Sequence, residues 1–97
     1  MGNAKEVLKG HIDLAERAMT EFALDNVRGA KALDNLRAAL SKKVLIDKEQ
    51  EELYMPAVYN ALATINSVPN TKIISRQLIE AIKEAKAEMQ AICDFLE

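Results

Sequence analysis

Two apolar ladders, one near each end of the chain, constrain this fold more than any other feature of the sequence. Leucine, isoleucine, alanine and methionine follow one another at a 4-3-4 spacing from Leu8 to Met19, and do so again from Leu78 to Met89. Residues three and four apart lie on one side of a helix with 3.6 residues per turn. Both ends of the chain are therefore predicted to form helices that bury one face against other helices.

The first half of the chain carries two amphipathic runs. Asn3 is a good N-cap, and residues 4 to 24 place their apolar side chains on one stripe. A break is expected at residues 24 to 26, because a continuing helix would bring Gly29 into the apolar seam. Residues 27 to 44 then form the second run.

Two further helices are expected in the second half. Asp47 is a candidate N-cap with Gln50 at the N3 position of a capping box, and acidic residues fill the first turn. Pro56 lies inside this third run and should kink it or mark its true start. The turn sequence Val68-Pro69-Asn70 ends the run, and the last helix extends from about Thr71 or Ser75 to Phe95.

The pattern predicts an all-α protein, a small antiparallel bundle of four helices in one domain of residues 1–97. The alternative is a three-helix protein whose first helix runs to Leu45, because Gly29 alone costs only about 1 kcal/mol in a helix. A chain this short buries only about 60% of its unfolded surface, so homodimerisation is a further option. Besides the two ladders, the expected core side chains include Val44, Tyr54, Val58, Ala61, Leu62, Ile65, Ile74, Ile92 and Leu96.

Charge argues against nucleic acid as a partner. The formal net charge is −2, whereas domains that bind nucleic acid usually carry a basic stripe. The nearest approach to such a stripe is Arg37, Lys42, Lys43 and Lys48, and its simplest interpretation is a solvated helix end. Nucleic-acid binding is therefore the least favoured function.

Cysteine content and hydropathy favour a cytoplasmic protein. Cys93 is the single cysteine, so neither an intrachain disulfide nor a zinc site is expected. No stretch approaches the roughly 18 apolar residues of a membrane span, and the first ten residues carry no apolar signal region. We expect no bound metal or cofactor.

His11, the single histidine, is the main candidate for chemistry. It lies within the apolar stripe of the first predicted helix. An ordinary pKa near 6.5 suits proton or phosphoryl transfer, so a phosphotransfer or other catalytic bundle centred on His11 is the alternative function. The simpler interpretation is a histidine at the edge of the core, satisfied by one hydrogen bond.

The leading hypothesis is a non-enzymatic protein that binds a protein partner or a second copy of itself, as a regulator, inhibitor or adaptor. No nucleophile with a neighbouring base, metal-ligand set or phosphate loop is evident, whereas amphipathic helices fill the chain. Tyr59 lies opposite the Tyr54 stripe, so it should be exposed, and tyrosines are enriched in interface hot spots. The candidate partner-binding residues are Tyr59, Lys42 and Lys43.

Methionine and phenylalanine side chains allow two interpretations. Met19, Met55 and Met89, together with Phe22 and Phe95, could line an adaptable binding groove. More often, residues of these types at helical spacing fill a core. We expect most of them to be buried.

Overall fold

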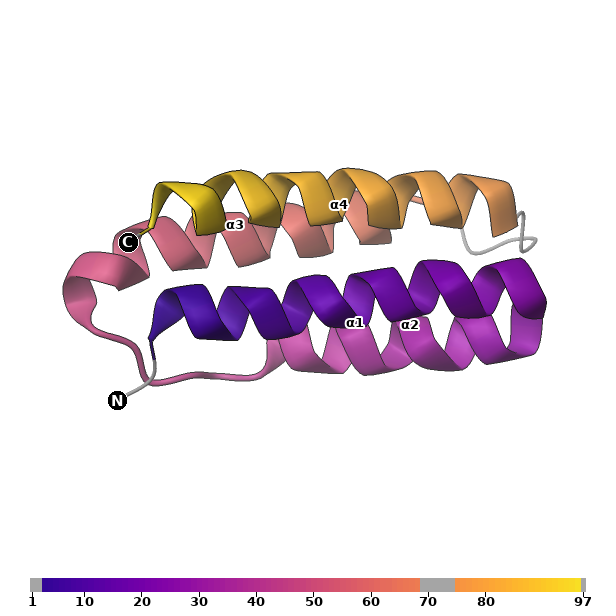
Figure 1. Cartoon of the computed structure of the whole chain (residues 1–97), viewed down its shortest axis with the longest axis horizontal. Helices are drawn as coiled ribbons and strands as arrows, with labels where there is room; N and C mark the ends of the chain where they lie inside the picture. The colour runs from indigo at the N-terminus through magenta and orange to yellow at the C-terminus, as the bar shows by residue number, and fades with distance from the viewer. Residues whose placement is uncertain (1–2, 69–74, 97) are drawn as a thin grey trace.

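The computed structural model describes residues 3–68 and 75–96, and these form a bundle of four helices (Figure 1). Consecutive helices run in opposite directions, which confirms the predicted antiparallel bundle. The helices lie along the longest dimension of a molecule that measures 40 × 21 × 20 Å. They are α1 (Ala4–Leu24), α2 (Asn26–Ser41), α3 (Lys48–Asn66) and α4 (Ser75–Phe95).

A single extended residue, Asp25, separates α1 from α2. Its φ and ψ are −167° and 135°, and its N–H donates to the Glu21 carbonyl oxygen at 2.9 Å. Its carboxylate accepts the N–H of Val27 at 3.1 Å, so the same residue ends one helix and caps the next. The predicted break is confirmed, and the alternative of one long first helix is wrong.

The second helix ends at Ser41, three residues before the predicted end at residue 44. Lys42 is already extended, and residues 42–47 lead to α3. Extended chain covers about 3.3 Å per residue against 1.5 Å in a helix, so an early end lets this short connection reach the start of α3. Val44 is half-buried and packs on the core from this connection, not from a helix.

The predicted capping box at the start of α3 is wrong, because the two side chains do not make its hydrogen bonds. Asp47 occupies the N-cap position, but its carboxylate makes no capping hydrogen bond. Gln50 turns away, and its Oε1 accepts the N–H of Ala4 at 3.0 Å. The first turn of a helix has N–H groups without helical partners, and Gln50 satisfies one of them in α1. A tertiary contact thus replaces the local one.

Pro56 lies inside α3, which begins eight residues earlier at Lys48. The predicted alternative that Pro56 marks the true start of this helix is therefore wrong. Proline has no backbone N–H, so the helical hydrogen bond to the carbonyl oxygen of Glu52 is missing. Both residues are exposed, so water can donate a hydrogen bond to this carbonyl oxygen instead.

The connection between α3 and α4 is described only in part. α3 ends at Asn66, and the backbone N–H of Ser67 closes its last turn. The predicted turn at Pro69 and Asn70, the candidate start at Thr71 and the core position Ile74 lie outside the described residues. α4 begins at Ser75, the second of the two predicted starts.

The apolar stripes of all four helices meet in one core, where Leu8, Ile82 and Met89 have no exposed surface. Leu62 lies at the margin of this core, half-buried, as do Met19, Leu78 and Ile92. The remaining core positions include Ile12, Phe22, Leu33, Leu36, Leu40, Tyr54, Ala57, Val58, Ala61, Ile65, Ala85, Cys93 and Leu96.

Packing between neighbouring helices is uneven. α1 packs closely against both α2 and α4, and α3 packs closely against α4. In contrast, α2 and α3 contact each other little within the described residues. Arg37 of α2 reaches across and donates from Nε to Asn66 Oδ1 of α3 at 3.2 Å. The bundle is therefore least tightly closed on its α2–α3 side.

Candidate partner-binding face

Tyr59 is strongly exposed, as predicted, with 74% of its surface accessible. Met55 precedes it by four residues on α3, is 48% exposed and therefore shares its face. Asn66 follows Tyr59 by seven residues on the same face and is the residue that accepts the hydrogen bond from α2. Tyr59 thus lies on the side of α3 that is turned toward the loosely packed α2.

Lys42 and Lys43 are exposed and line a hollow of about 280 Å³ beside the end of α2. Met55 lines the same hollow from α3, together with buried residues of the core. We call this hollow the α2–α3 pocket, and we call Lys42, Lys43, Met55 and Tyr59 the α2–α3 face. The structure thus brings the two lysines to Met55 and places Tyr59 one helical turn beyond it, outside the pocket.

Leu45 was missed by the sequence reasoning. It lies in the connection between α2 and α3 and is 73% exposed. The sequence pattern extended α2 almost to this residue, so nothing marked it as an exposed apolar side chain. The expectation that most of the five methionine and phenylalanine side chains are buried is wrong: Phe22 and Met89 are buried, Met19 is half-buried, and Met55 and Phe95 are exposed.

His11 is buried, with 6% of its surface exposed, and its Nε2 lies 3.0 Å from the hydroxyl oxygen of Tyr54. This hydrogen bond links α1 to α3 through the core. Burial lowers the pKa of His11 below its ordinary value of 6.5 and raises the pKa of Tyr54 above 10.0. The geometry matches a core histidine satisfied by one hydrogen bond. A phosphoryl donor would need an imidazole that solvent can reach.

Removing the Tyr54 hydroxyl should destabilise the protein. In Tyr54→Phe the ring remains, but the buried His11 Nε2 loses its partner, which should cost about 1–2 kcal/mol. Urea unfolding followed by circular dichroism measures this loss. Tyr59→Phe is the matched control, because the exposed Tyr59 ring leaves its hydroxyl to water. Equal stability of the two variants would contradict the assigned hydrogen bond.

The buried imidazole should also make stability depend on pH. Because the pKa of His11 is lower in the folded state, the unfolded chain binds more protons below pH 6.5. The free energy of unfolding should therefore fall as pH drops from 6.5 toward the folded pKa, and this contribution should be constant above 6.5. Urea unfolding from pH 5 to 8 tests this against His11→Gln, which does not titrate. An identical slope in both proteins would contradict the assignment.

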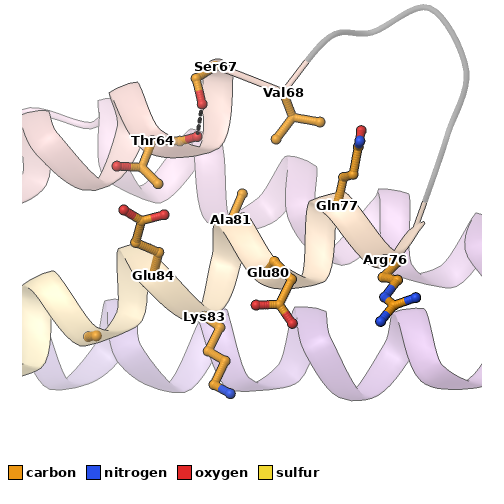
Figure 2. A pocket seen from close by; sticks show the side chains of 10 residues that line it. Thr64, Ser67, Val68, Arg76, Gln77, Glu80, Ala81, Lys83 and Glu84 are labelled. Carbon is orange, nitrogen blue, oxygen red and sulfur yellow. Dashed lines mark hydrogen bonds between the residues drawn. The ribbon is translucent and has the colours of Figure 1, made fainter.

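A second, larger hollow of about 800 Å³ lies between the end of α3 and the first half of α4 (Figure 2). Its walls carry charges of both signs, with Arg76 and Lys83 near Glu80 and Glu84. This mixed charge makes it a weaker candidate than the α2–α3 face.

Two further features bear on the possible chemistry. Among residues 3–68 and 75–96, no three histidine, cysteine, aspartate or glutamate side chains form a group that could hold a metal ion. No helix in the described part of the chain is long and apolar enough to cross a membrane.

No protein-family model matches the chain, and comparisons with curated proteins and with solved structures found no significant match.

Proposed function

We propose that this chain is a non-enzymatic helical protein that acts by binding another protein through the α2–α3 face. The observation that carries the proposal is the pair of exposed side chains Met55 and Tyr59 on one stripe of α3, of which Met55 lines the same pocket as Lys42 and Lys43. Tyrosine supplies a large contact area with few rotatable bonds, and methionine adapts its shape to a partner.

The position of this face in the bundle supports the proposal. α2 and α3 pack on each other less than the other neighbouring helices do, so a partner could cover this side without disturbing the core. Exposed Leu45 lies in the same α2–α3 connection as Lys42 and Lys43. Two lysines next to apolar side chains form the polar rim that protein interfaces usually have.

Photocrosslinking from the α2–α3 face tests the proposal. A benzophenone amino acid placed at Tyr59 should give a discrete crosslinked species in cells that express the protein. The same amino acid at Asp13, which is exposed on α1, should not. Adding Met55→Lys to the Tyr59 probe should reduce the yield about tenfold, because a hot-spot contact contributes 1.4 kcal/mol or more.

The mass of the crosslinked species distinguishes the possible partners. A species of twice the chain mass identifies a second copy, and light scattering across a concentration series should then show a dimer. Any other mass identifies a different protein. Equal yields from Tyr59 and Asp13, or no species from either position, would contradict the proposed face. Circular dichroism should show that each variant keeps its helices.

A further inference from the structure

The α2–α3 pocket extends from the surface to the core. Leu40, Tyr54 and Val58 line it and belong to the buried core of the bundle. Val44 of the connection and Met55 of α3 complete its apolar lining. An apolar group in this pocket would therefore leave water and contact buried side chains, which is the main favourable term in binding.

The volume of the pocket limits the size of the ligand. An apolar cavity of about 150 Å³ can hold benzene, which has six non-hydrogen atoms, and the α2–α3 pocket has about 280 Å³. Binding pockets for small molecules commonly begin near about 300 Å³, so this one lies at the small end of that range. It fits a ligand of about ten non-hydrogen atoms, the size of an eight-carbon carboxylate.

Charge at the mouth of the pocket favours an anion. Lys42 and Lys43 line it, and Glu51 is the single carboxylate among its lining residues. Both lysines are exposed, so each can keep its stem on the apolar wall while its ammonium group meets a ligand at the surface. A hydrogen bond between an ammonium group and a carboxylate is stronger than one between neutral groups.

We propose that the α2–α3 pocket binds small amphipathic carboxylates, with the apolar tail against Leu40 and Val58 and the carboxylate at Lys42 and Lys43. This site binds a small molecule and does not depend on the protein-binding function proposed above. The pocket lies beside the α2–α3 face, and Met55 belongs to both.

The protein contains its own reporter for this site. Tyr54 lines the pocket, and its hydroxyl is hydrogen-bonded to Nε2 of His11 behind it. His11 is the single histidine of the chain, so its imidazole resonances in an NMR spectrum are unambiguous. A ligand that contacts Tyr54 should shift these resonances although it does not contact His11 itself.

NMR titration of the full chain with octanoate tests the proposal. Saturable shifts are expected for the methyl groups of Leu40, Val44 and Val58 and for the His11 imidazole. The methyl resonance of Ala81, which lines the larger hollow between α3 and α4, should not shift. Octylammonium has the same tail and the opposite charge, and it should bind about tenfold more weakly. Shifts spread over the whole surface, or none that saturate, would overturn the proposal.

Two double variants test the role of the lysines. Lys42→Gln with Lys43→Gln should weaken octanoate binding about tenfold, because the charged hydrogen bonds are lost. Lys31→Gln with Lys83→Gln changes the net charge equally at exposed positions away from the pocket and should leave binding unchanged. If both pairs weaken binding equally, or if octylammonium binds as well as octanoate, the anion site is wrong.

Discussion

Replacing Ile82 by aspartate is expected to unfold the protein. Ile82 lies on the inner face of α4 with no exposed surface, among apolar residues of the core. An uncompensated buried charge costs about 3–5 kcal/mol, and the apolar contacts of isoleucine are lost in addition. The total stability of a small domain is only about 5–15 kcal/mol. Circular dichroism should therefore show loss of most of the helical signal at 25 °C.

The neighbouring residue provides the control for this substitution. Lys83 is exposed on the same helix, and Lys83→Asp introduces the same side chain one position further along the chain. A surface substitution of this kind should change stability by no more than about 0.5 kcal/mol. Cooperative melting of Ile82→Asp near the wild-type temperature would show that the inner face of α4 is assigned wrongly.

The two described helical glycines, at residues 10 and 29, should respond to alanine with opposite signs. Alanine is favoured over glycine in helices by about 1 kcal/mol. At Gly29, however, an added Cβ atom would lie 2.7 Å from the Cα atom of Phe22 in α1, and it would also meet the Phe22 ring. Backbone atoms cannot move aside separately, so α1 and α2 must separate. We expect Gly29→Ala to lose about 2 kcal/mol, or roughly 10 °C in melting temperature.

Gly10 is the matched site without this constraint. A Cβ atom there meets nothing within 4 Å, and the residue is exposed in the middle of α1. Gly10→Ala should therefore stabilise the protein by about 0.5–1 kcal/mol. Thermal melts of the two variants beside the wild type test both signs. If Gly29→Ala also raises the melting temperature, the close approach of α1 and α2 is not present in solution.

The candidate face could be predicted from the sequence only in part. Exposure of Tyr59 follows from its position on α3 opposite Tyr54, because a helical wheel needs only local spacing. The meeting of Lys42 and Lys43 with Met55 does not follow, because these residues belong to different segments. It depends on the path of the connection after Ser41 and on how far α2 lies from α3. Leu45 was missed because a wheel assigns no face to an extended residue.

The contacts of His11 and Gln50 show the same division. An apolar stripe predicted that His11 is buried, but its partner Tyr54 is 43 residues away on another helix. Gln50 fits a local capping box equally well by sequence, yet its Oε1 accepts a hydrogen bond from Ala4, 46 residues away. Local sequence rules identify polar groups that require a hydrogen bond. They do not identify the bonding partner, because several groups elsewhere in the chain could form that hydrogen bond.

The sequence by itself determined the all-α class, the antiparallel order of the helices and most of their buried faces, whereas the structure excluded the three-helix alternative. These follow from the 3.6-residue periodicity, from the N-cap Asn3 and from short connections. Only the tertiary structure decided which helices pack closely, where α2 ends and which side chains form the α2–α3 pocket. Periodicity fixes the direction of a side chain around its own helix, whereas the distance between two helices depends on contacts along both, such as Gly29 against Phe22.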